Sequence, residues 1–160
     1  MNVPVSIVTI PARTLVGIKK ELSLSNYDVA VLWQQFMPRR KEINNTTSND
    51  LYSLAIYPAN YFDVFDQTKL FTRAACMEVS KVDHIPDGFE QFNIPESLYA
   101  VFQYKGSNTS NEIFEYIYGT WIPSSGYRLD DRPHFEILGE KYKNGSSDSE
   151  EEIWIPVIRE

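Results

Sequence analysis

Hydrophobic residues follow the same order of patterns in both halves of the chain. Short runs rich in β-branched and aromatic residues, which are typical of strands, lie at residues 5–10, 15–20, 89–94 and 98–105. An Ile-Pro pair separates the runs in each half, Ile10-Pro11 in the first and Ile94-Pro95 in the second. Because proline cannot donate to a strand ladder, it marks a break or an edge. We therefore expect each half to begin with a strand that is kinked at Ile-Pro.

Each half then carries one amphipathic segment with the period of a helix. In the first half the large apolar side chains recur at i, i+3, i+4, i+7 and i+8, and the second half has a similar stripe. The two stripes are Val29, Leu32, Trp33, Phe36 and Met37, and Ile113, Phe114, Ile117, Tyr118 and Trp121. They predict helices over residues 29–37 and 113–121.

Two more strand patterns follow each helix. They lie at residues 51–57, 71–79, 134–138 and 152–158. The order β-α-β-β, stated twice, is typical of an α+β fold with helices on an antiparallel sheet. We predict a single domain over residues 1–160, with pseudo-repeats at roughly 1–82 and 83–160. Its two helices should lie on one face of the sheet, with a ligand cleft between the repeats.

Composition and charge exclude several classes of protein. The 160 residues include 15 basic and 22 acidic side chains, and the resulting net charge of −7 argues against a nucleic-acid partner. No apolar run reaches the roughly 18 residues of a membrane span, and the first residues lack a signal-peptide pattern. Cys76 has no partner for a disulfide, and two histidines are too few for most His-built metal sites. We expect a cytoplasmic protein with no metal and no cofactor.

The last two predicted strands carry candidate chemistry on their faces. Side chains alternate along a strand, so His134 shares a face with Glu136, and Glu152 shares one with Trp154. If the odd-numbered residues of both strands meet the helices, Glu136, Glu152 and Trp154 lie together on the other side of the sheet. A solvated acidic loop is expected just before Glu152, and its members are Asp148, Glu150 and Glu151.

The second half also contains a series of motifs in a distinctive order. They are Ile94-Pro95, Tyr99-Ala100-Val101-Phe102, Ile113, Ile117-Tyr118, Trp121-Ile122-Pro123, Ser125-Gly126-Tyr127, Asp131, Pro133, Phe135-Glu136 and Glu152 to Val157. Together they resemble the GyrI-like effector-binding domain family, which includes the ligand-binding domains of AraC-type and MerR-type multidrug regulators. The family fold is itself a β-α-β-β duplication, so the resemblance covers nearly the whole chain, although the first half matches only in pattern.

The resemblance implies a cleft between the repeats that is lined by aromatic side chains and has a carboxylate at its floor. Glu136 matches the pocket glutamate of the family. Trp154 matches the aromatic residue of the family's closing strand, and Glu152 occupies a position that is sometimes a second acid. Trp121 and Tyr127 match the aromatic positions of the helix-end motif. Repeat position alone suggests two more ligand-binding residues in the first half, Tyr57 and Phe36.

From this resemblance we expect a stand-alone small-molecule binding protein, and not an enzyme, for lipophilic and cationic drug-like compounds. A carboxylate in an apolar cleft is costly when unpaired, and a bound cation offsets that cost. The chain has no helix-turn-helix pattern, so we expect no nucleic-acid partner. Two alternatives stay open. One is a gyrase-inhibitor-like interaction module with a protein partner or a homodimer, and the other is a hydrolase of reactive electrophilic compounds that uses a pocket glutamate.

Overall fold

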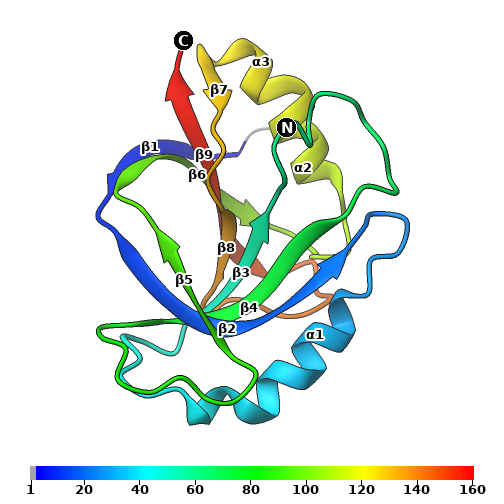
Figure 1. Ribbon diagram of the computed structural model, residues 1–160. Coiled ribbons are helices and arrows are strands. Elements are labelled where there is room, and N and C mark those ends of the chain that lie inside the picture. Colours follow the sequence, from blue (N-terminus) through cyan, green and yellow to red (C-terminus); the bar gives the residue numbers. More distant parts are fainter. Residues whose placement is uncertain (1–2) are drawn as a thin grey trace.

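The computed structural model describes residues 3–160 and contains the predicted β-α-β-β order twice (Figure 1). The first half consists of β1 (Val5–Ile10), β2 (Arg13–Leu22), α1 (Val29–Phe36), the 3-10 helix η1 (Met37–Glu42), β3 (Leu51–Ile56) and β4 (Phe71–Val79). The second half consists of β5 (Glu90–Ile94), β6 (Ser97–Lys105), α2 (Glu112–Tyr116), the π-helical η2 (Ile117–Trp121), α3 (Ile122–Ser124), β7 (Tyr127–Leu129), β8 (His134–Leu138) and β9 (Glu150–Arg159). The hydrophobic pattern does not predict β7, because three residues are too few to show a period.

The sheet is antiparallel and has the strand order β1-β6-β9-β8-β3-β4-β2-β5, with β7 beside β9. The two Ile-Pro kinks lie side by side, since Ile10 pairs with Ser97 and Arg13 pairs with Ile94. At the kinks the strands change partner, so β1 pairs with β6 whereas β2 pairs with β5. This exchange connects the two ends of the strand order, and the sheet is strongly curved as a result (Figure 1).

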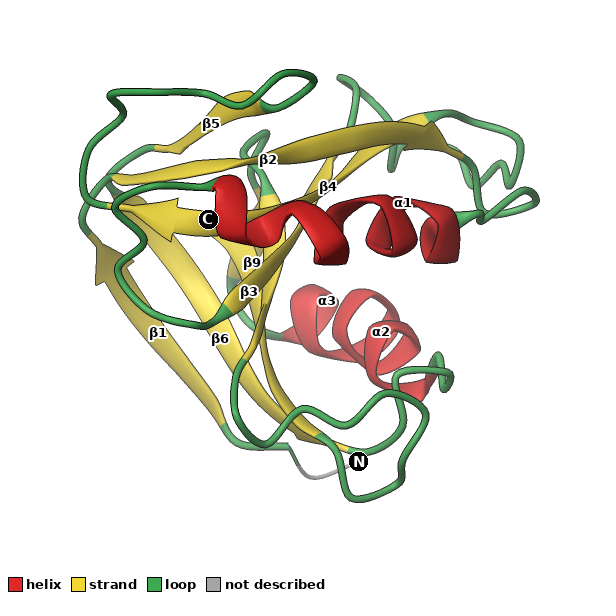
Figure 2. Ribbon diagram, turned by 90° about the horizontal axis from the view of Figure 1, so that it is seen from below, coloured by secondary structure: helices red, strands yellow, loops and turns green. Residues whose placement is uncertain are grey.

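Both helical regions pack on the same face of the curved sheet (Figure 2). α1 buries Leu32 and Phe36 against side chains of β2 and β4. α2 and η2 bury Ile113 and Ile117 against side chains of β6 and β9. The predicted α+β arrangement, with two helices on one face of an antiparallel sheet, is confirmed. No helix within residues 3–160 is both long and apolar enough to cross a membrane.

The opposite face of the sheet encloses a third apolar core. The curved strands bring together side chains of both halves, among them Leu15, Tyr52, Leu54, Tyr99, Phe135 and Trp154. β2 and β4 approach closely at Gly17, where a Cβ atom would collide with the backbone of Ala75 and Cys76. Glycine is therefore required at this position by the close strand contact.

Candidate functional site

A row of directly paired residues crosses the helix-bearing face of the sheet and marks where the two halves meet. From β2 to β6, its members are Ile18, Ala75, Ser53, Glu136, Ile153 and Phe102. The residues at each end of the row belong to the cores beneath α1 and α2. Ser53 on β3 and Glu136 on β8 stand in the middle. We call the middle of this row, around Ser53 and Glu136, the seam. The seam carries the Glu136 carboxylate between the two helical cores.

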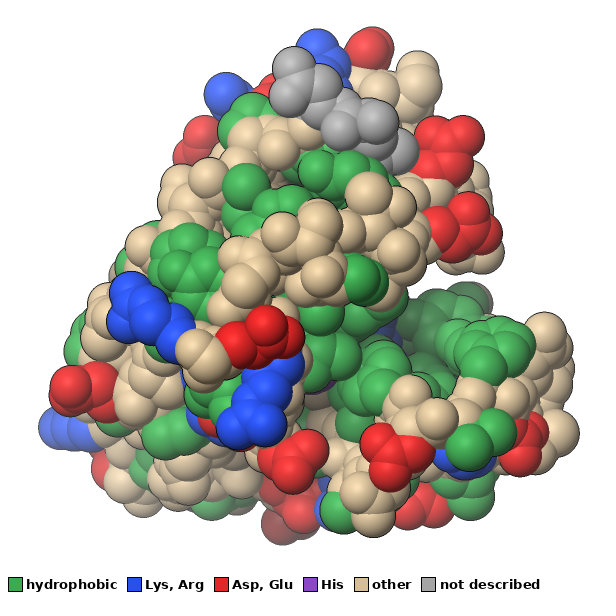
Figure 3. All heavy atoms as spheres, turned by 90° about the horizontal axis from the view of Figure 1, so that it is seen from above, with side chains coloured by type: hydrophobic (Ala, Val, Ile, Leu, Met, Phe, Trp, Pro, Cys, Tyr) green, Lys and Arg blue, Asp and Glu red, His purple; other side chains and the backbone are tan. Residues whose placement is uncertain are grey.

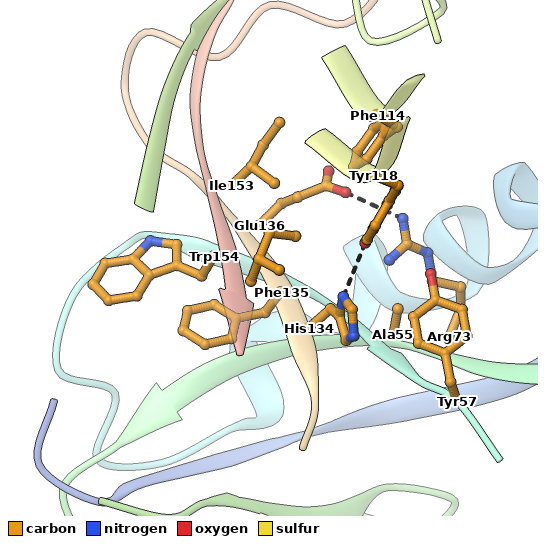
Figure 4. Close-up of a pocket in the computed structure, with 11 residues that line it drawn as sticks. Ala55, Tyr57, Arg73, Phe114, Tyr118, His134, Phe135, Glu136, Ile153 and Trp154 are labelled. Carbon is orange, nitrogen blue, oxygen red and sulfur yellow. Dashed lines mark hydrogen bonds and ion pairs between the residues drawn. The ribbon is translucent and has the colours of Figure 1, made fainter. Parts of the chain in front are cut away.

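The Glu136 carboxylate points toward Arg73 across the seam (Figure 4). Nη2 of Arg73 lies 3.3 Å from Oε1 of Glu136, and the two side chains are only 12% and 15% exposed. Nε of Arg73 also donates a hydrogen bond to the Tyr27 hydroxyl at 3.1 Å. A buried ion pair of this kind avoids the much larger cost of a single unpaired charge. The charge of Glu136 is thus balanced within the protein itself.

A second carboxyl group lies next to this ion pair. Glu151 on β9 is 8% exposed, and its Oε2 has no hydrogen-bond partner among the described residues. Burial, followed by the negative charge of Glu136, raises the pKa of Glu151 to about 8. The prediction that Glu151 belongs to a solvated loop is wrong. β9 begins at Glu150, two residues before the predicted start at Glu152, and its alternation turns Glu151 toward the helix-bearing face together with Ile153.

Tyr118 and His134 form another polar contact of the seam (Figure 4). The Tyr118 hydroxyl lies 2.9 Å from Nδ1 of His134, a residue that is 5% exposed. Burial and then the positive charges of Arg73 and Arg132 lower the pKa of His134 to about 3, so its imidazole is neutral at pH 7. Tyr118 belongs to η2, whose π-helical turn is a rare geometry that frequently occurs at functional sites.

The connection between β3 and β4, residues 57–70, covers the seam with aromatic rings, and we call it the aromatic loop. The Phe62 ring stacks on Tyr118 and His134, with centroid distances of 5.4 and 5.7 Å. The Tyr57 ring contacts both Phe62 and His134, at 4.8 Å in each case. These rings close the seam on the side of the aromatic loop.

Two small cavities lie on either side of the Phe62 contacts. The inner cavity, about 30 Å³, lies between Glu136 and Tyr118. The outer cavity, about 200 Å³, lies between the aromatic loop and residues 129–134. Tyr57 and His134 line both cavities, while Phe62 lines the outer one and stacks on Tyr118 of the inner one. Tyr57 and His134 therefore form the wall that the two cavities share, and the Phe62 ring covers His134 and Tyr118 from the side of the outer cavity.

The surface of the molecule is hollowed near hydrophobic side chains. Figure 3 shows a notch along whose walls hydrophobic side chains gather. In the aromatic loop, Phe62, Val64 and Phe65 are 44%, 66% and 76% exposed. Exposed aromatic and aliphatic side chains on a loop are energetically unfavourable in water, so this loop has apolar surface that a ligand can cover.

The structure brings together only some of the predicted site residues. Glu136, Tyr57 and Trp154 are all among the residues that line the inner cavity. The Trp154 indole points away from Glu136 into the opposite core, where it stacks on Phe135 at 5.2 Å (Figure 4). The expectation that Glu136 and Trp154 share a face is wrong, because Phe135 and not Glu136 pairs with Trp154. A register shift of one residue turns every side chain of a strand to the other face.

The other predicted site residues line neither cavity. Glu152 pairs with Ile137, so it faces away from the helices and accepts a hydrogen bond from Gln103. Trp121 and Tyr127 stack on each other at 6.2 Å, against the core beneath α2. Phe36 is fully buried beneath α1. Its aromatic side chain contributes to packing of the core.

Sequence reasoning missed Arg73, Tyr118 and Glu151 as members of the site. Tyr118 lies in a helical stripe that predicted core packing, and Arg73 lies in a strand whose partner strands were unknown. A signal for Glu151 was present, since alternation places it on the same face as Ile153. Within residues 3–160, no group of three or more His, Cys, Asp or Glu side chains is placed to hold a metal ion.

Comparison with known proteins relates the chain to small-molecule binding domains. A model of the GyrI-like small molecule binding domain matches residues 4–158. The transcriptional regulator BrlR of Pseudomonas aeruginosa is 26% identical over 159 residues, which cover 98% of this chain and 56% of BrlR. The chain thus spans about half the length of this curated relative.

Two solved structures share the fold. SAV2435, solved with bound tetraphenylphosphonium, superimposes with a TM-score of 0.72 at 18% identity, covering 99% of this chain and 94% of SAV2435. A hydrolase encoded by lin2189 from Listeria innocua superimposes with a TM-score of 0.60 at 11% identity, covering 96% of this chain and 91% of the hydrolase. At these identities the likeness concerns the fold alone.

Proposed function

Because the chain belongs to the family of GyrI-like small-molecule binding domains, we propose that it binds a lipophilic cation at the seam between its two halves. The observation that carries the proposal is the Glu136 carboxylate, which lines the inner cavity together with the rings of Tyr57 and Tyr118. The buried carboxyl group of Glu151 lies beside it. Aromatic faces attract cations without demanding a particular hydrogen-bond geometry, so such a site accepts ligands of several shapes.

The electrostatics of the seam favour a cation over a neutral or anionic ligand. Arg73 faces Glu136 and Glu151 at the inner cavity, so the seam holds two negative charges against one positive charge once Glu151 is ionised. At the outer cavity, three acidic side chains lie with one cation, and they are Asp63, Asp130, Asp131 and Arg132. His134 is neutral at pH 7 and adds no positive charge. In a site of low dielectric constant, one uncompensated negative charge attracts a cation much more strongly than it does in water.

Binding requires movement of the aromatic loop. Pockets for drug-sized ligands measure about 300–1,000 Å³, whereas the cavities beside Phe62 measure about 200 and about 30 Å³. Displacement of Phe62, whose ring stacks on Tyr118 and His134, exposes these two side chains to the ligand and enlarges the outer cavity toward the inner one. The ligand then replaces Phe62 as the group that stacks on these rings.

The relatives support an effector-binding role. SAV2435 was solved with tetraphenylphosphonium, which is a lipophilic cation of the chemistry that we propose here. BrlR is named as a transcriptional regulator, and 98% of this chain aligns with about half of it. We propose that occupancy of the seam by a cation is the signal that this domain provides.

Calorimetric titration with tetraphenylphosphonium chloride tests the proposal, with the neutral triphenylphosphine oxide as the comparison ligand. We expect the cation to bind more tightly, and Glu136→Gln to weaken it by about ten- to a hundredfold, since a charge-assisted contact contributes about 1.5–3 kcal/mol. Glu152→Gln is the matched control, because Glu152 lies on the opposite face of the sheet. Equal affinity for both ligands, or an unaffected Glu136→Gln variant, would refute cation binding at the seam.

A hydrolase is the second candidate, because a structural neighbour carries that name and the seam contains a glutamate and a tyrosine. The contacts favour binding over catalysis. Arg73 holds Glu136 in an ion pair, and the Tyr118 hydroxyl is engaged by His134. Burial also raises the pKa of Tyr118, so its phenol keeps its proton near neutral pH. Turnover of a reactive electrophile that is lost in Glu136→Gln would favour the hydrolase instead.

A further inference from the structure

The charges at the seam balance only if one of its two carboxyl groups is neutral. Arg73 is the guanidinium partner of Glu136, with 3.3 Å between Nη2 and Oε1. Glu151 has no such partner, since its Oε2 is buried without a hydrogen bond among the described residues. A buried carboxyl group without a cationic partner takes up a proton rather than carry an unpaired charge.

We propose that Glu151 supplies the net negative charge that selects a cation, and that it does so by releasing its proton to solvent when the cation enters. The step conserves charge: one cation is taken up, the O–H bond of the Glu151 carboxyl group breaks, and one proton leaves. With Glu151 ionised, Arg73 faces two carboxylates, and the bound cation balances the second one. This inference rests on the proposed function, because it concerns the same seam.

The other titratable groups near Glu151 do not supply this proton. The titratable groups that face Glu151 or its neighbour Glu136 are Arg73 of β4, Tyr104 of β6, Tyr118 of η2, Tyr57 of the aromatic loop and Tyr142 of the β8–β9 connection. Burial raises the pKa of Tyr57, Tyr118 and Tyr142, so these phenols keep their protons at pH 7. His134 is already neutral at pH 7, because its pKa is lowered to about 3, so no imidazolium proton is available for release. Glu151, whose pKa is raised to about 8, is the group that is protonated yet close to titrating.

Proton release is measured by titrating the protein with tetraphenylphosphonium chloride at pH 7 in phosphate and in Tris, whose ionisation enthalpies differ. A carboxyl group whose pKa is raised to about 8 is mostly protonated at pH 7, so we expect close to one proton to be released per bound cation. The association constant should rise about tenfold from pH 7 to pH 9, as the ionised fraction rises by about that factor.

Three variants locate the proton. Glu151→Gln should release none and show a flat pH profile, while Glu152→Gln should behave like the wild type. Glu136→Gln leaves Glu151 as the ion-pair partner of Arg73, and it should also release none. Circular dichroism confirms that each variant is folded. Only Glu151→Gln assigns the proton to Glu151; if this variant does not fold, the proton release and the pH profile of the wild type still test the inference.

The outcomes separate this inference from the proposed function. If the wild type binds the cation without releasing a proton, or if Glu151→Gln still releases one, the inference is wrong and cation binding stands. If the wild type does not bind tetraphenylphosphonium at all, both fail. Proton release that disappears in Glu151→Gln but persists in Glu152→Gln supports the inference.

Discussion

Replacement of Glu151 by glutamine should change how the stability of the protein depends on pH. The folded protein holds a proton on Glu151 up to a pH of about 8, whereas an unfolded carboxyl group loses it near 4.5. Between these values the folded state binds more protons than the unfolded state. The free energy of unfolding therefore falls as the pH rises through this window, by up to about 1.4 kcal/mol per pH unit.

His134 acts with the opposite sign in a lower window. Its pKa falls from 6.5 to about 3 on folding, so the unfolded state binds the extra proton between these values. Its contribution to stability therefore rises with pH through that window and is complete above pH 6.5. Between pH 6.5 and 8, Glu151 is the main one of these two groups that still changes the stability, and over that interval its contribution falls by roughly 1–2 kcal/mol.

Urea denaturation at pH 6.5, 7.25 and 8 measures this effect. We expect the difference in unfolding free energy between Glu151→Gln and the wild type to shift by roughly 1–2 kcal/mol toward the variant over this range. Groups that titrate in both proteins cancel in the difference. Glu152→Gln, on the opposite face, should keep a constant difference from the wild type. If the Glu151→Gln and wild-type curves run parallel, Glu151 is ionised in the folded protein and the account of the seam is wrong.

Two further predictions concern the aromatic loop and the strand contact at Gly17. Phe62→Ala removes the ring contacts with Tyr118 and His134, about 0.5–1.5 kcal/mol each, as well as those with Tyr57 and Tyr61. Opening of the site then costs less, so the association constant for tetraphenylphosphonium should rise at least about tenfold. Weaker binding in a fluorescence titration would instead show that Phe62 contacts the ligand. In Gly17→Ala, the new Cβ meets the backbone of β4, so the free energy of unfolding in urea should fall by about 3 kcal/mol, and an unchanged midpoint would contradict this close contact.

Most elements of the fold could be predicted from local pattern. The strand pattern at residues 5–10 corresponds to β1, and those at 71–79 and 134–138 correspond to β4 and β8. Side-chain period and the two Ile-Pro breaks are properties of short segments, so they are readable without knowing what lies opposite. The same holds for the helix-facing side of β9, where Ile153, Ile155 and Val157 pack beneath α2 as their alternation predicts.

The composition of the site depended on strand register, which no single segment contains. Alternation along β8 places His134 with Glu136, yet it does not say which residue of β9 lies opposite. The pairing of Phe135 with Trp154 sends the indole into one core and Glu136 to the seam. The motifs alone therefore grouped an aromatic and an acid that the sheet separates.

The electrostatics of the seam were also decided by tertiary structure alone. Arg73 and Glu136 are 63 positions apart in the chain, and they meet because β3 lies between their strands and pairs with both. The sequence by itself determined the two repeats, their kinks, their helices and the presence of an acid at position 136. Whether that acid is free, paired or accompanied by a buried second carboxyl group depends on which strands become neighbours. Neighbouring strands are chosen by burial over the whole chain, because each sheet face is stable only when its partners cover it.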